Sequence, residues 1–186
     1  DEGDTHSCGE IPAGCLGIST LCSITLDGMM MKKGIPVVTS FAGVVKVLDG
    51  RPVEFTDLIA YAGSSLDPMK VFMARKVTRS ADAIFKGSGK ILANVREVPV
   101  AAEEQAVSLL EQLKSIGFGG LITVGRPGEP TLGCPVGSGK IGIAFCAGVN
   151  GPVAAEELGA NIKTMPISML MDYSKTTELK NGDLLK

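Results

Sequence analysis

The stretch Gly43-Val-Val-Lys-Val-Leu-Asp-Gly-Arg-Pro-Val-Glu-Phe55 decides the fold class. Two apolar runs, residues 43–47 and 52–55, stand on either side of Asp49-Gly50. Asp-Gly between apolar runs indicates a β-hairpin, because both residues tolerate the positive φ angles of a tight turn. Residues 16–31 repeat the arrangement around Asp27-Gly28, so we expect a second hairpin there and a β-rich first third of the chain.

Helices and further strands follow. Asp67 as N-cap and Pro68 in the first turn predict a helix over residues 67–76. Apolar residues recur at i, i+4 and i+7 over residues 101–116, which predicts a longer helix. A third helix is predicted over residues 152–158, and strands are predicted over residues 90–98, 120–124 and 141–146. Together these elements indicate the α+β class.

The two halves of the chain share a motif. Gly34-Ile-Pro-Val37 and Gly133-Cys-Pro-Val136 each begin nine positions before another glycine, Gly43 and Gly142. The spacing predicts an internal duplication (residues 16–60 and 118–160), folded as two related mixed-sheet lobes with helices packed on them and a ligand groove between them. Chance recurrence in a Gly- and Val-rich chain is the alternative. The folded domain is expected over residues 11–162, between a flexible acidic start at 1–10 and a C-terminal segment with a polar tail at 163–186.

The composition excludes several classes of protein. The 186 residues are 45% hydrophobic and 20% charged, and 18 Lys and Arg against 20 Asp and Glu give a net charge of −2. Disordered chains are poorer in apolar residues. A membrane helix needs about 20 predominantly apolar residues in a row, which the sequence does not offer. The near-neutral charge makes direct DNA contact by this segment unexpected.

Cysteine usage indicates a reducing compartment. Five cysteines are an odd number, in a chain large enough to bury a core, so we expect free thiols and a cytoplasmic location. The acidic start does not resemble a signal peptide. Because the first residue is not Met, we expect this segment to come from a longer protein.

Metal and nucleophile chemistry are both disfavoured. Cys8, Cys15 and Cys22 are spaced by seven residues, whereas zinc ligands generally occur in pairs two to four residues apart. A nucleophilic cysteine or serine needs a neighbouring base, usually His, and His6 is the single histidine. We therefore expect no metal, no cofactor and no catalytic residue.

A polar ligand pocket is the favoured alternative, assembled from three segments. Cys22 and Thr25 lie on a predicted strand rich in hydroxyls, for which a solvated edge strand is the other interpretation. Gly63, Ser64, Ser65 and Asp67 precede a helix N-terminus, where backbone N–H groups attract anions, although ordinary N-capping would explain them as well. The last segment is Arg96-Glu97, at the end of a predicted strand.

Arg96 is the candidate that best suits an anion. Arginine holds a carboxylate through two parallel hydrogen bonds. A structural ion pair or a lobe interface would explain Arg96 and Glu97 equally well. If Arg96 binds a dicarboxylate, Arg96→Ala abolishes that binding while the fold remains intact.

The order and spacing of several motifs resemble the sensor (nitrogen regulatory) domain of NrpR, the nitrogen-responsive transcriptional repressor of methanogenic and related archaea. The resemblance covers about residues 11–160. Its motifs are Cys22-Ser-Ile-Thr-Leu-Asp-Gly28, Gly34-Ile-Pro-Val37, Phe41-Ala-Gly43, Arg51-Pro52, Gly63-Ser-Ser-Leu-Asp-Pro68, Gly87-Ser-Gly-Lys-Ile-Leu-Ala93, Arg96-Glu-Val-Pro99 and Gly148-Val-Asn150. The chain departs from the family at Asp27, where Asn is common, at Ala42 and Ser64, and at Gly151, which splits an Asn-Pro pair.

The resemblance implies a ligand-sensing domain over residues 11–162 and not an enzyme. Such domains repress nitrogen-assimilation genes and relieve repression when they bind 2-oxoglutarate, a small anionic metabolite. They work as homodimers or higher oligomers, with a winged helix-turn-helix domain in the parent chain or in a partner repressor subunit. An oligomerisation-only co-repressor domain and a cysteine-dependent enzyme are the alternatives.

Overall fold

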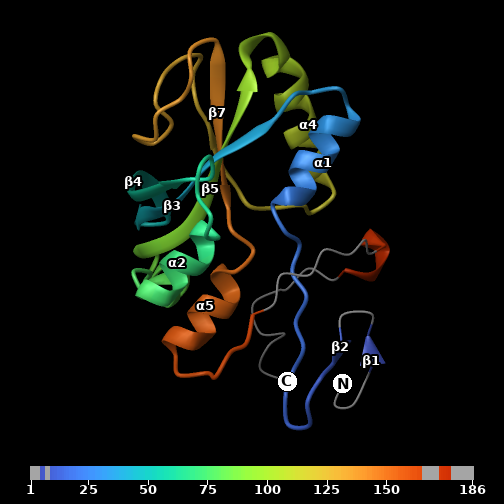
Figure 1. Ribbon diagram of the computed structural model, residues 1–186, viewed down its shortest axis with the longest axis vertical. Coiled ribbons are helices and arrows are strands. Elements are labelled where there is room, and N and C mark those ends of the chain that lie inside the picture. The colour runs from blue at the N-terminus through green and yellow to red at the C-terminus, as the bar shows by residue number, and fades with distance from the viewer. Residues whose placement is uncertain (1–4, 7–8, 165–171, 177–186) are drawn as a thin grey trace. The chain divides into compact units, whose positions relative to one another are not determined.

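A computed structural model of the chain describes residues 5–6, 9–164 and 172–176 (Figure 1). The chain divides into two compact units, Thr20–Ile162 and a second one made of Asp1–Ser19 with Lys163–Lys186. In the second unit, β1 (Thr5–His6) pairs antiparallel with β2 (Gly9–Glu10), and Tyr173–Lys175 form a short 3-10 helix. The predicted flexible start and polar tail lie largely outside the described residues.

One five-stranded antiparallel sheet organises Thr20–Ile162. Its spatial order is β4-β3-β5-β7-β6. The strands are β3 (Val38–Leu48), β4 (Arg51–Ala60), β5 (Gly89–Pro99), β6 (Leu121–Val124) and β7 (Lys140–Cys146). The predicted α+β class is confirmed. The strands of both expected repeats join this single sheet instead of two mixed-sheet lobes, because β5 pairs with β3 along one edge and with β7 along the other.

The hairpin at Asp49-Gly50 is confirmed. It joins β3 to β4, and both turn residues have positive φ angles, 49° and 73°. The turn is therefore placed where the local sequence tolerates it.

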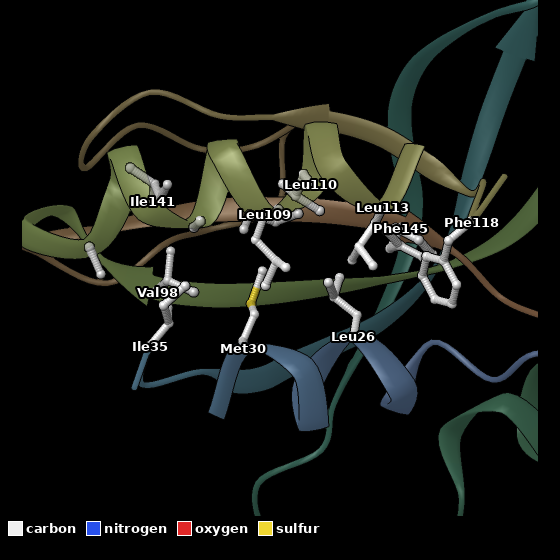
Figure 2. Packing of buried hydrophobic residues seen from close by; sticks show 13 residues of the cluster. Leu26, Met30, Ile35, Val98, Leu109, Leu110, Leu113, Phe118, Ile141 and Phe145 are labelled. Atoms are coloured by element: carbon white, nitrogen blue, oxygen red, sulfur yellow. The ribbon is translucent and has the colours of Figure 1, made fainter. Parts of the chain in front are cut away.

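The hairpin predicted at Asp27-Gly28 is wrong, because residues 24–32 form a helix, α1 (Ile24–Lys32). Leu26 and Met30 lie one turn apart on α1 and are fully buried. Figure 2 shows both side chains pointing into a cluster with Leu109 and Leu113. Burial of this helical stripe outweighs the turn preference of Asp-Gly.

The other predicted helices are confirmed, with small differences at their ends. They are α2 (Pro68–Arg75), α4 (Glu103–Ser115), which follows a 3-10 turn at Val100–Ala102, and α5 (Asn150–Glu157). A fourth, α3 (Ser80–Lys86), was not predicted. The Asp67 carboxylate caps α2 by accepting a hydrogen bond from the Met69 amide at 3.0 Å, as the sequence indicates.

Two apolar clusters cover one face of the sheet. The first joins α1 and α4 to β5 and β7, and the second joins α2 and α5 to β3 and β5. Figure 1 shows α1 and α4 toward one end of the sheet and α2 and α5 toward the other. Val98 belongs to the first cluster and Leu92 to the second, so the stretch of β5 between them connects the two.

Helix α5 supplies two polar side chains that hold neighbouring elements. The Asn150 side-chain amide donates to the Leu92 carbonyl at 2.7 Å and accepts from the Leu92 amide at 2.8 Å. It thereby extends the ladder of β5 beyond the end of β7. The Glu157 carboxylate accepts hydrogen bonds from the Thr78 hydroxyl (2.6 Å) and from the Ser80 and Ala81 amides (3.0 and 2.8 Å), and so caps α3.

No helix in the described part of the chain has the length and apolar content needed to cross a bilayer.

We expect Glu157→Gln to lower the free energy of unfolding by about 1 kcal/mol at pH 7, as loss of a helix cap generally does. Burial raises the pKa of the Glu157 carboxyl, but the hydrogen bonds from Thr78, Ala81 and Ser80 together lower it by more than burial raises it. The net pKa is therefore below its ordinary value. The stabilisation is therefore full above the pKa of the unfolded carboxyl and lost as pH falls through the folded pKa. Urea unfolding at several pH values measures this.

The matched control is Glu156→Gln, which removes only an exposed ion pair with Lys76 at 3.8 Å. Equal destabilisation by both variants would contradict the capping role of Glu157.

Candidate functional site

Two polar side chains interrupt the apolar face of β5. Alternate residues of a strand share a face, so Asn94 and Arg96 lie between Leu92 and Val98. Asn94 is 6% exposed and Arg96 only 1% exposed. A guanidinium this deeply buried requires a counter-ion and hydrogen-bond acceptors.

Asp27, in the first turn of α1, is the counter-ion. Arg96 donates from Nε to Asp27 Oδ1 and from Nη2 to Asp27 Oδ2 at 3.4 Å. The Thr39 hydroxyl donates to the same Oδ2 at 3.0 Å, from the position on β3 directly opposite Arg96. The charge pair therefore ties α1 to the central strand β5 and to its neighbour β3.

Ser23 makes a second connection between α1 and β5. It stands immediately before the helix, is buried, and accepts a hydrogen bond from Asn94 Nδ2 at 2.9 Å. Its side chain makes no capping bond to α1. Ser23 and Asp27 are four residues apart, so one helix face presents both to β5.

Two polar atoms of this cluster lack partners. Arg96 Nη1 and Asn94 Oδ1 are buried and make no hydrogen bond with any described residue. Leaving such groups unsatisfied costs about 1–3 kcal/mol each. The Ser23 hydroxyl can accept or donate, so rotating the Asn94 amide by half a turn keeps that bond and offers Nδ2 instead. In that orientation Arg96 Nη1 and Asn94 Nδ2 are two buried N–H donors without an acceptor among the described residues.

Tyr61, which follows β4, is within electrostatic range of the cluster. Burial raises the pKa of its phenol to about 12; the charge of Asp67 raises it further and that of Arg96 lowers it. Cys22 and Asp27 add smaller contributions. The hydroxyl is therefore protonated at neutral pH and can donate a hydrogen bond.

The loop before α2 has its own local bonds. Gly63 has a φ angle of 78°, and the exposed Ser64 donates through its hydroxyl to the Leu66 carbonyl at 2.7 Å. Ser65 is exposed as well. The sequence allowed two interpretations of the loop before α2, an anion site and an ordinary N-cap, and the structure shows Asp67 as the N-cap. The Asp67 carboxylate disfavours a second anion at the same helix end.

Cys22 and Thr25 do not lie on a strand as the sequence predicted, and Glu97 does not share a face of the sheet with Arg96. Cys22 is exposed just before α1, and Thr25 lies within α1, so neither belongs to a strand. Glu97 points to the sheet face opposite Arg96, because the two residues are consecutive in β5.

Glu97 accepts from the Gly137 amide at 2.9 Å and from Lys140 Nζ at 2.7 Å. Burial raises the pKa of the Glu97 carboxyl, but the contacts with Lys140 and Gly137 together lower it by more than burial raises it. The net pKa is therefore below its ordinary value. Glu97 therefore fixes the loop before β7.

Several residues of the cluster were not predicted as site residues: Ser23, Asp27, Thr39, Tyr61 and Asn94. The i, i+4 spacing of Leu26 and Met30 is the signal that would have identified α1 and, with it, the shared face of Ser23 and Asp27.

The thiols of Cys134 and Cys146 are poorly suited to nucleophilic chemistry. Burial raises the pKa of Cys134 to about 12, with a further increase from Glu97, and raises that of Cys146 to about 11. Both are protonated at neutral pH, whereas the thiolate is the nucleophile. Cys8 and the His6 side chain lie outside the described part, within which no group of three or more His, Cys, Asp or Glu could hold a metal.

Comparison with known proteins gives consistent results. The family model of "NrpR regulatory domains NRD1 and 2" matches residues 1–178. The chain is 43% identical over 169 residues to the global nitrogen regulator NrpRI of Methanosarcina mazei, covering 91% of this chain and 52% of that protein. It is 34% identical over 167 residues to the global nitrogen regulator NrpR of Methanocaldococcus jannaschii, covering 89% of this chain and 30% of that one.

A solved structure is similar as well. The crystal structure of a nitrogen repressor-like protein from Methanococcus jannaschii superposes with a TM-score of 0.65 at 28% identity, covering 80% of this chain and 61% of that one. The chain thus spans about half, or less, of the curated relatives it matches.

We expect Asp27→Ala to lower the free energy of unfolding by about 3 kcal/mol, because it leaves the buried guanidinium without its counter-ion. Urea denaturation at pH 7 measures the loss. The control is Glu129→Ala, which removes an exposed ion pair with Arg126 at 3.9 Å and should cost less than about 1 kcal/mol. Similar values for the two variants would show that Arg96 does not depend on Asp27.

Proposed function

This chain belongs to the family of NrpR regulatory domains, and from that premise we propose that it binds 2-oxoglutarate at the Arg96 cluster and thereby relieves repression of nitrogen-assimilation genes. Membership makes it a regulatory domain of a nitrogen regulator. The ligand, its site and the response are the proposal.

The observation that carries the proposal is the buried Arg96 guanidinium with its unpartnered Nη1. Arginine recognises a carboxylate through two parallel N–H donors. One edge of the guanidinium already holds the Asp27 carboxylate, so its surroundings suit this chemistry. Asn94 and the Tyr61 hydroxyl offer further donors for a keto or carboxylate oxygen.

Asp27 and the ligand would compete for Arg96. A ligand carboxylate that takes the guanidinium edge displaces the Asp27 side chain, which is 17% exposed and carried on the first turn of α1. Helix α1 packs on α4 and β5 through Leu26 and Met30. Displacement would therefore shift α1 on the sheet.

The shift of α1 supplies the response. A ligand changes an equilibrium only through its different affinity for two states. Here the states differ in whether Arg96 binds Asp27 or the ligand. We propose that the domain acts as a homodimer, and that α1 transmits the change to a winged helix-turn-helix domain in the parent chain or in a partner repressor subunit.

We expect titration calorimetry of the chain with 2-oxoglutarate to show saturable binding, with succinate and glutamate much weaker. Arg96→Lys should weaken the binding at least tenfold, because an ammonium cannot form the two-bond contact, and Arg96→Ala should abolish it. The matched control, Arg126→Ala, changes an exposed arginine and should bind as the wild type does. Circular dichroism establishes that each variant is folded.

Two results would overturn this assignment. Unchanged affinity in folded Arg96→Lys would place the ligand elsewhere. Absence of heat with the folded wild-type chain would favour a domain that only assembles oligomers.

We expect Asp27→Asn to bind 2-oxoglutarate about tenfold more tightly. Asn retains hydrogen-bonding capacity toward Arg96 and Thr39 but removes the internal negative charge that competes with the ligand. The same calorimetric titration measures the gain. Weaker binding in this variant would mean that Asp27 contacts the ligand favourably instead of competing with it.

A further inference from the structure

Three cationic side chains form a row across the sheet at the far end of β5 from Arg96. Lys46 on β3 stands directly opposite Lys90 on β5, and Arg79 forms an isolated bridge with Lys90 on its other side. Lys90 and Arg96 are six positions apart along β5, or about 20 Å at about 3.4 Å per residue. The row is therefore distinct from the Arg96 cluster.

The backbone makes these three residues direct neighbours across the sheet. The Lys90 amide and carbonyl exchange hydrogen bonds with Arg79, at 3.3 and 2.9 Å. Because the backbone groups of Lys90 face Arg79, its pairing with Lys46 is of the non-hydrogen-bonded kind, with Cα atoms about 4.5 Å apart. Like charges directly opposite one another on a sheet are destabilising. The sheet register therefore places two like charges opposite one another.

Gly89 allows Arg79 to reach the row. A Cβ atom at Gly89 would lie 2.2 Å from the Arg79 carbonyl oxygen and 2.6 Å from the Ala83 amide nitrogen. Only glycine therefore permits the segment before α3 to pack against β5 at this point. The close backbone approach at Gly89 thus places Arg79, the third cation of the row, beside Lys90.

The acidic side chains near the row neutralise only part of its positive charge. Lys46 makes an exposed ion pair with Glu54 at 3.7 Å. Within the described part of the chain, neither Arg79 nor Lys90 makes an ion pair within 4 Å. The net positive charge of the row is thus available to an anion.

Two other carboxylates lie close to the row but are engaged elsewhere. Asp82 pairs with Lys86 at 2.7 Å, one turn along α3. Glu157 accepts the Thr78 hydroxyl and the amides at the start of α3. The charges of Asp82 and Glu157 interact electrostatically with the Arg79 guanidinium at longer range. Among the described residues, neither carboxylate forms an ion pair with Arg79 within 4 Å.

The row lines an open groove of about 490 Å³. Lys76, which follows α2 and pairs with Glu156 at 3.8 Å, also lines the groove, and Thr78 and Ser88 add hydroxyls. Asp82 is the acidic residue of the lining. An open groove of this volume has room for a small anion.

We propose that this groove binds a small phosphate-bearing anion, whose phosphoryl oxygens contact Lys46, Lys90 and Arg79. A diphosphate carries two to three negative charges on closely spaced oxygens, which matches three adjacent cations better than singly charged carboxylates do. Lys and Arg are both common phosphate ligands in proteins. The bound anion would also relieve the repulsion between Lys46 and Lys90.

The test is calorimetric titration of the 186-residue chain with inorganic pyrophosphate at low ionic strength. We expect saturable binding that weakens as salt is added. Lys90→Gln should weaken it at least tenfold, because it removes the central charge of the row. The matched control, Lys114→Gln on the exposed side of α4, makes the same charge change elsewhere and should leave the affinity unchanged.

Two further variants make the result specific. Arg79→Gln should weaken pyrophosphate binding as Lys90→Gln does, whereas Arg96→Lys should not affect it. This separates the groove from the 2-oxoglutarate proposal, which stands or fails on Arg96. Thermal unfolding establishes that Lys90→Gln is folded, and without ligand its midpoint should be no lower than that of the wild type.

Three results would overturn the proposal. The first is pyrophosphate affinity that is the same in folded Lys90→Gln and in the wild type, or no binding at all. The second is equally tight binding of malonate, which would mean that the groove does not select phosphate. The third is selective binding of duplex DNA at these residues without binding of pyrophosphate, which would assign the row to a macromolecule.

Discussion

The buried pair of Arg96 and Asp27 is the interaction on which the arrangement of this domain depends. A guanidinium that is 1% exposed can be accommodated only with a counter-ion, and the counter-ion comes from a helix 69 residues earlier in the chain. Thr39 and Ser23 add hydrogen bonds from β3 and from the start of α1. The position of α1 on the sheet is therefore coupled to the charge state around Arg96.

This pair lies between two apolar clusters. The cluster of α1 and α4 and the cluster of α2 and α5 share one face of the sheet, and β5 passes beneath both. Apolar packing offers the carboxylate of a metabolite no polar group to bind, whereas the buried Arg96 guanidinium keeps one N–H group without an acceptor. We propose that a ligand acts at this point, where α1 is held by charge as well as by packing.

Local chemistry predicted some elements well and others poorly. The turn at Asp49-Gly50 and the capping of α2 by Asp67 depend on the residues themselves, so the sequence was sufficient. The stretch around Asp27-Gly28 has the same turn residues but becomes helical, because Leu26 and Met30 are buried against α4. The sequence left Arg96 open as an anion ligand, a member of a structural ion pair or a lobe-interface residue, and the structure shows an ion pair with Asp27. That partner is brought in by the topology, which no local pattern contains.

The most direct test of the central claim is an NMR titration that follows the Arg96 side-chain Nε–H signal, assigned by its loss in Arg96→Lys. If 2-oxoglutarate replaces Asp27 at the guanidinium, this signal shifts during the titration, together with the backbone amides of the first turn of α1. If 2-oxoglutarate binds while the Arg96 signal and the α1 amides stay unchanged, the ligand does not act through this pair and the account is contradicted.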